Sequence, residues 1–220
     1  MKQRYEIQTT ADGSATIYLP EIDEHYHSVR GALAESEHIY RDLAFMHRCV
    51  PGEVRVLEVG FGTGLNALVT MRAVPPGTRV HYRTLELYPL DADAIAALDF
   101  GVAVAPLHAA PWGSPVEITP NFVLEKMQCD FLTADLGSGW DVVYLDSFAP
   151  EKQPAMWSEE ALRRLVDAMA PGAVLTTYCA KGAIRRLLAS LSLCVERLPG
   201  PPGGKREVLR ATKPRPIPPV

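Results

Sequence analysis

The chain has 220 residues, of which 47% are hydrophobic and 22% charged, and its formal net charge is −4 at pH 7. This length and composition predict one domain with a packed core. No apolar run approaches the ~20 residues of a membrane-spanning helix, and the first residues lack the apolar stretch of a signal peptide. The four cysteines form no Cys-x-x-Cys pair, which is typical of free thiols in a reducing compartment. We therefore expect a cytoplasmic protein.

The charge is distributed unevenly along the chain. Residues 181–220 carry nine Lys or Arg and two Glu, a net charge of +7, whereas residues 1–180 carry −11. A basic segment on an acidic body can form a local phosphate-binding face. The alternative is a set of solvated helix faces and a charged tail.

The first 52 residues predict a small appendage that consists of a β-hairpin and a helix. Apolar and polar residues alternate from residue 5 to residue 19, around Asp12-Gly13, a pair that favours a tight turn. Residues 31–46 then predict one or two helices. His25 and His27 could suggest a metal site, but the sequence offers no third ligand nearby at a sensible spacing, so we expect no metal.

Residues 53–212 alternate between strand and helix patterns, which predicts a doubly wound, mostly parallel α/β sheet with helices on both faces. The expected strands are 54–59, 79–86, 122–127, 141–146 and 173–178, of which 122–127 is possibly an edge strand, and a closing antiparallel pair follows at 195–197 and 207–210. The expected helices are 65–73, 91–98, 159–169 and 182–190. Four prolines interrupt residues 101–126, so their role stays open. Residues 213–220 are a proline-rich tail that we expect to be extended or disordered.

A glycine-rich turn joins the first predicted strand of this core to its helix. It contains Gly60, Gly62 and Gly64, and Glu58 stands two residues before the first glycine. Glycines let the chain turn sharply and let a ligand lie against the backbone, while the following helix points free N–H groups at it. A dinucleotide fingerprint requires glycine where Leu65 stands. The observed spacing resembles the first motif of class I S-adenosylmethionine (SAM) methyltransferases, in which the acid and the loop hold the methionine end of the cofactor.

Two further acids stand at strand ends where an adenosine would bind. Glu86 ends the second core strand, 22 residues after Gly64, a distance at which an acid typically accepts hydrogen bonds from both ribose hydroxyls. Either Asp130 or Asp135 could accept from the adenine amine. We prefer Asp130, because it follows an apolar strand pattern directly.

Asp146 is the candidate catalytic residue, because it follows a buried strand at the sheet edge where such folds bind ligands. If the acceptor is an alkylamine, whose pKa is ~10, it arrives protonated. Asp146 could then hold the ammonium and help remove its proton; the alternative is a strand-end cap. Tyr178 and Lys181 could line the acceptor pocket, and Lys205 and Arg206 could bind a phosphate.

These motifs together resemble the MnmC-type tRNA methyltransferase domain. The matching stretches are 26–28 with 31–32 and 35–36, then 57–66, 144–154 with Trp157, 177–182 and 204–207. The resemblance implies that a methyl group passes from SAM to the aminomethyl nitrogen of 5-aminomethyl-2-thiouridine at the tRNA wobble position, with the acid that matches Asp146 facing the amine. Within these stretches we add Asn66 to the cofactor site, and His27 and Lys152 to the substrate site.

Many members of that family carry a fused flavin-dependent oxidoreductase half, and this chain has no second dinucleotide motif, so we expect the stand-alone form, without flavin and without an obligate protein partner. The tRNA would bind through the basic C-terminal third. Two alternatives stay open. One is an aminopropyltransferase-like or other small-amine alkyltransferase, which would carry more acids around the acceptor. The other is a non-catalytic module of the same fold, which should have lost the glycine turn or Asp146.

Overall fold

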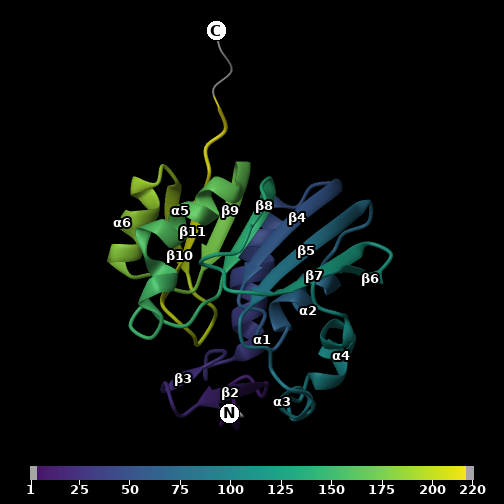
Figure 1. Cartoon of the computed structure of the whole chain (residues 1–220). Helices are drawn as coiled ribbons and strands as arrows, with labels where there is room; N and C mark the ends of the chain where they lie inside the picture. The colour runs from purple at the N-terminus through teal and green to yellow at the C-terminus, as the bar shows by residue number, and fades with distance from the viewer. Residues whose placement is uncertain (1–3, 217–220) are drawn as a thin grey trace.

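The computed structural model describes residues 4–216, and its largest element is an eight-stranded sheet (Figure 1). The strand order is β10-β11-β9-β8-β4-β5-β7-β6. Five strands are parallel: β4 (Gly52–Val59), β5 (Thr78–Glu86), β7 (Phe122–Gln128), β8 (Trp140–Leu145) and β9 (Met169–Thr177). The antiparallel strands are β6 (Pro115–Thr119) at one edge and β11 (Glu207–Thr212) and β10 (Cys194–Pro199) at the other. This confirms the predicted mostly parallel sheet with a closing antiparallel pair.

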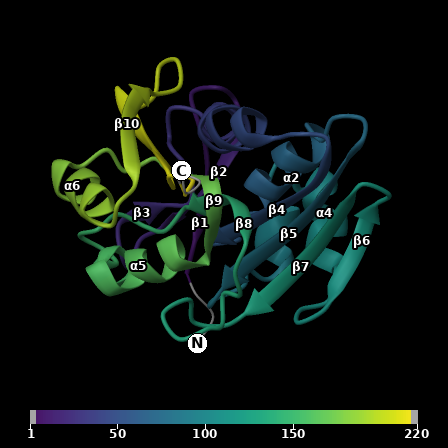
Figure 2. The same cartoon turned by 90° about the horizontal axis from the view of Figure 1, so that it is seen from above.

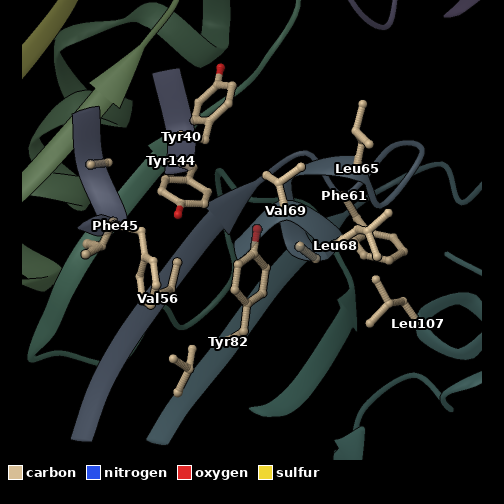
Figure 3. Close-up of a cluster of buried hydrophobic side chains, with 14 of the residues drawn as sticks. Tyr40, Phe45, Val56, Phe61, Leu65, Leu68, Val69, Tyr82, Leu107 and Tyr144 are labelled. Atoms are coloured by element: carbon tan, nitrogen blue, oxygen red, sulfur yellow. The ribbon is translucent and has the colours of Figure 1, made fainter. Parts of the chain in front are cut away.

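Helices cover both faces of this sheet (Figures 1 and 2). One face packs against α1 (Ala32–Glu35), the π-helix η1 (Ser36–Met46), α2 (Leu65–Arg72) and α4 (Gly101–Ala109). The other packs against α5 (Glu159–Ala168) and α6 (Gly182–Ser190). The period of two along a strand explains the division, because Val142 and Tyr144 of β8 join the first core while Val143 and Leu145 join the second. Figure 3 shows part of the first core, with Tyr40 of η1 beside Tyr144.

The N-terminal residues form a small separate sheet of β1 (Glu6–Thr9), β2 (Ala15–Leu19) and β3 (Glu24–His25), which lies at one end of the large sheet (Figure 1). The predicted hairpin is confirmed, with Gly13 at φ 87° in its turn. Its apolar face packs against α3 (Ala92–Ala96) and against Tyr26 and Phe148. The hairpin is thereby fixed over the carboxyl end of β8.

The proline-interrupted segment contains two elements that the sequence patterns did not predict. Residues 101–109 form α4 despite Pro106, and β6 pairs antiparallel with β7. The possibility that residues 122–127 form an edge strand is therefore wrong, because β6 occupies that edge. Pro115 is tolerated because it opens an edge strand, where a missing N–H leaves no ladder bond unmade. Of the predicted proline-rich tail, residues 213–216 have no regular structure and 217–220 lie outside the described residues.

Among residues 4–216, no helix is both long enough and apolar enough to cross a membrane.

Candidate active site

A cavity of about 410 Å³ lies at the carboxyl ends of the parallel strands. Here the chain order reverses, since β5 and β7 lie on one side of β4 while β8 and β9 lie on the other, and ligands of doubly wound folds bind at such a point. The cavity is lined by the glycine turn after β4, by the residues that follow β5, β7, β8 and β9, and by residues 24–29. Its size falls in the range of ~300–1,000 Å³ that small-molecule sites occupy.

The glycine turn forms one wall, and its backbone needs glycine for two reasons. Gly60 and Gly62 have φ angles of 94° and 48°, values that side chains with a Cβ rarely adopt. A Cβ on Gly60 would also lie 2.7 Å from the carbonyl oxygen of Asp146, and one on Gly62 would lie 2.9 Å from the Tyr26 ring. Gly64, at the N-terminus of α2, is not part of the wall.

Glu86 and Asp130, the predicted adenosine ligands, line the neighbouring wall of the cavity. One Glu86 oxygen accepts from the Gly62 N–H at 3.1 Å and the other from the Tyr88 N–H at 2.9 Å. Each oxygen keeps a further lone pair for a ligand hydroxyl. Asp135 is not among the lining residues and instead accepts from the Gly137 N–H. Of the two predicted adenine partners, Asp130 is therefore the one that lines the cavity.

Asp146 lines the cavity with both of its oxygens fixed by side chains. The Tyr40 hydroxyl donates to Oδ1 at 2.6 Å, and the Asn66 amide donates to Oδ2 at 2.8 Å. Burial raises the pKa of Asp146, while hydrogen bonds from Tyr40 and Asn66 act in the opposite direction. The result is an oriented carboxylate that is more basic than one in water.

Glu58 lies beneath the cavity rather than on its wall. It is fully buried, and burial raises its pKa to about 8. Neither Glu58 oxygen has a hydrogen-bond partner in normal geometry among the described residues, and the same holds for Asn66 Oδ1, Tyr82 Oη and Thr84 Oγ1. The Tyr82 and Thr84 hydroxyls can donate to Glu58, and a protonated Glu58 can donate to Asn66 Oδ1. Asn66, which donates to Asp146, is also near enough to lower the pKa of Glu58, and a direct contact of Glu58 with cofactor stays a prediction.

The sequence patterns assigned no role to two residues of this site, Tyr40 and Glu35. Tyr40 belongs to the apolar face of η1, and its bond to Asp146 joins residues 106 positions apart. Glu35 occurs in one of the matching stretches, but nothing in its spacing assigns it to a site. It lines the cavity, it is 7% exposed, and burial raises its pKa to about 7. Its Oε2 accepts from the Ser28 N–H at 2.8 Å.

Three of the predicted substrate residues also line the cavity: His27, Tyr178 and Lys205. The His27 ring nitrogen Nε2 lies 2.6 Å from Thr63 Oγ1 in the glycine turn. Burial lowers the pKa of His27 to about 4, so the ring is neutral at pH 7. The Tyr178 hydroxyl donates to the Ser147 carbonyl at 2.8 Å.

The other three predicted substrate residues lie outside the cavity wall: Lys152, Lys181 and Arg206. Lys181 forms an ion pair with Glu151, and Lys152 Nζ lies 4.0 Å from Asp23 Oδ2. Trp157 is buried, and its ring N–H donates to the Phe148 carbonyl at 2.8 Å, so this tryptophan packs rather than offering a free stacking surface.

Comparisons with known proteins place this geometry in a class. Residues 121–214 match the model of a family described as S-adenosyl-L-methionine-dependent methyltransferase. The structure aligns with a Burkholderia thailandensis N1-methyltransferase solved with S-adenosylhomocysteine, at TM-score 0.53 and 17% identity over 81% of this chain and 78% of that one. It also aligns with spermidine synthase from Thermotoga maritima, at TM-score 0.65 and 15% identity over 96% and 70% of the two chains. The chain therefore has the class I fold of SAM-dependent methyltransferases, and its residues 121–214 match that family.

Within that class the chain is a relative of the MnmC proteins. It aligns with MnmC2 from Aquifex aeolicus at TM-score 0.79 and 25% identity, over 100% of this chain and 73% of that one. The "tRNA 5-methylaminomethyl-2-thiouridine biosynthesis bifunctional protein MnmC" of Cupriavidus necator is 33% identical over 89% of this chain and 32% of its own length. The protein of that name from Pseudomonas fluorescens is 34% identical over 86% and 32%. The chain thus spans about a third of the length of these curated relatives.

Proposed function

We propose that this enzyme transfers a methyl group from SAM to the aminomethyl nitrogen of 5-aminomethyl-2-thiouridine at the tRNA wobble position, giving 5-methylaminomethyl-2-thiouridine. The observation that carries the proposal is the Asp146 carboxylate, which lines the cavity and is fixed by Tyr40 and Asn66, while the backbone carbonyl of Asp146 lies against Gly60 of the glycine turn. The names of the similar MnmC proteins supply the tRNA base.

The cofactor end of the cavity suits SAM. When bound, SAM supplies an electrophilic methyl group on a sulfonium cation. Gly60 and Gly62 would let its methionine part lie against the backbone, Glu86 would accept from the ribose hydroxyls, and Asp130 would accept from the adenine amine. The carboxylates of the wall would favour the positive charge of the sulfonium.

At the acceptor end, the chain must prepare a neutral amine. An alkylammonium with a pKa of ~10 has no free lone pair at pH 7. Asp146 accepts the ammonium proton, and burial makes it a better acceptor by raising its pKa. Tyr40 and Asn66 hold its two oxygens so that the nitrogen is placed in one direction, and such placement supplies much of the acceleration in reactions of this kind.

The tRNA would bind along the exposed face of α6 and the adjoining loop. Arg185, Arg186 and Arg206 are exposed and form no ion pair with any residue of the described 4–216. These free cations can neutralise backbone phosphates. We assign Lys152 and Lys181 to the same contact, and we place the reaction in the cytoplasm, where tRNA is modified.

A small-amine alkyltransferase is the second candidate, and one observation favours it. Five carboxylates line the cavity: Glu24, Glu35, Glu86, Asp130 and Asp146. Such a wall would also attract a free polyamine. The unpaired arginines of α6 favour a polyanion instead, and a small cation gives them no role.

The test is methyl transfer from labelled SAM to two tRNA pools, one carrying 5-aminomethyl-2-thiouridine and one carrying the carboxymethylaminomethyl form, with spermidine as a third acceptor. We expect label in the first pool only, and its loss in Asp146→Ala with the SAM dissociation constant preserved. Label in spermidine alone would establish the second candidate. SAM binding without transfer to any acceptor would contradict the proposal.

A further inference from the structure

The ammonium group of Lys205 lies inside the cavity, although the sequence suggested that this residue faces a phosphate. Its Nζ stands 3.5 Å from the centroid of the Tyr178 ring, the arrangement of a cation–π contact. Part of Lys205 is exposed, but burial of its ammonium lowers the pKa of Lys205, while Glu35 and Asp146 attract the charge and raise it. The ammonium therefore contacts one aromatic face, and two carboxylates that line the same cavity attract it without forming an ion pair with it.

Tyr178, Glu35 and Asp146 line the same cavity as Lys205 and could also recognise a substrate ammonium. Asp146 is the acid that would face the substrate amine, and Glu35 lines the same cavity. Glu35 uses Oε2 to accept from Ser28, and none of its hydrogen bonds within the described residues engages Oε1. An aromatic face and two carboxylates are the groups that recognise a primary ammonium. Lys205 carries such an ammonium at the end of a flexible stem.

We propose that Glu35, Asp146 and Tyr178 form the subsite for the substrate ammonium, and that Lys205 occupies this subsite in the free enzyme until the substrate displaces it. The inference rests on the proposed amine acceptor and adds to it a second recognition carboxylate and an internal competitor. Glu35 binds the ammonium together with Asp146, and Asp146 remains the proton acceptor.

Electrostatic repulsion explains why the Lys205 ammonium would leave the subsite when SAM and the substrate bind. SAM brings a positive sulfonium and the substrate brings an ammonium, so a third cation in the same cavity would repel both. Lys205 belongs to the loop between β10 and β11, and it forms no ion pair with a described residue. Rotation of its own side chain is enough to vacate the subsite.

Two substitutions separate this role from a phosphate contact. Lys205→Met removes the competitor, so we expect the KM for 5-aminomethyl-2-thiouridine tRNA to fall several-fold with kcat preserved. Glu35→Gln keeps an acceptor for Ser28 but removes a charge, so we expect that KM to rise about ten-fold or more with an unchanged SAM dissociation constant. Arg163→Met removes an exposed cation of α5 outside the cavity and should change neither value.

A fall in KM for Lys205→Met with a rise for Glu35→Gln supports the proposal. A rise in KM for Lys205→Met with a shallower salt dependence would show a phosphate contact and overturn it. An unchanged KM in Glu35→Gln would also overturn it, because the second carboxylate would then not bind the amine.

A second measurement does not depend on turnover. The Tyr178 ring should shift the Lys205 Hε signals upfield in the proton NMR spectrum, and these signals are assigned by their absence from Lys205→Met. Addition of SAM with an anticodon stem-loop carrying 5-aminomethyl-2-thiouridine should move them to ordinary values. If the wild-type enzyme methylates no tRNA, the proposed function fails, but upfield signals would still show Lys205 in the cavity. Ordinary signals in the free enzyme would overturn the internal competitor.

Discussion

At the scale of single residues, two side chains set the orientation of the Asp146 carboxylate. Its two oxygens are held by one hydroxyl and one amide, from η1 and α2. Both donors would keep the carboxylate in place as it gains and loses a proton. The orientation of Asp146 is thus a property of its neighbours as much as of its own strand.

Tyr40→Phe tests this control. We expect kcat to fall about 10- to 100-fold, since the change removes a hydrogen bond that orients the proton acceptor, and we expect the SAM dissociation constant to stay near the wild-type value. Tyr144→Phe is the matched control, because it also removes a buried tyrosine hydroxyl, one bonded to Thr70 at 3.0 Å. Equal losses of kcat in the two variants would show that Tyr40 acts through packing alone. Steady-state kinetics and calorimetry supply the two values.

The raised pKa of Glu58 predicts that the stability of the fold depends on pH. Its pKa in the folded chain is about 8, raised by burial from 4.5. Between these values the folded state binds more protons than the unfolded state, so stability is full below about pH 4.5 and is lost as the pH rises through about 8. From pH 5 to pH 8 the wild type should lose on the order of 3 kcal/mol more than Glu58→Gln. Urea unfolding at both pH values measures this, and parallel losses would mean that Glu58 is ionised throughout.

At the scale of elements, the glycine turn and the strand ends were predictable because each leaves a local pattern. Three alternating glycines and an acid at a strand end can be read within a few residues. The Tyr40–Asp146 contact and the pairing of β6 with β7 were not predictable, because the first joins residues 106 positions apart and prolines obscure the second. The complete burial of Glu58 was not predictable either, since an acid beside a glycine motif gives no sign of which face of the strand it occupies.

Gly60→Ala tests whether the turn is shaped for a ligand. The new methyl group would meet the Asp146 carbonyl at 2.7 Å in a backbone with φ 94°, so the turn must move and SAM affinity should fall about ten-fold or more. Gly77→Ala is the control, since its φ is 78° and nothing lies within 4 Å of the added Cβ. That variant should lose about 1 kcal/mol of stability and keep SAM affinity. Equal affinities in the two variants would contradict a ligand-shaped turn.

At the scale of the whole molecule, the acidic body attracts cations, whereas the basic C-terminal third attracts anions. The acids of the cavity attract a sulfonium and an ammonium, whereas the arginines of α6 face solvent. A tRNA that places one modified uridine in the cavity would bring its phosphates toward that exposed face. The net charge of −4 hides this division, which appears only when the charges are counted by segment.

The double variant Arg185→Met/Arg186→Met tests this division. If both arginines contact phosphates, the slope of log KM for tRNA against log salt should become shallower by about 2, and KM at low salt should rise. The SAM dissociation constant and kcat at saturating tRNA should not change, because neither residue lines the cavity. Arg163→Met, on the exposed side of α5, controls for a general loss of positive charge. If the double variant keeps the wild-type salt slope, tRNA binds elsewhere, and Arg206 with Lys181 and Lys152 would be the next cations to replace.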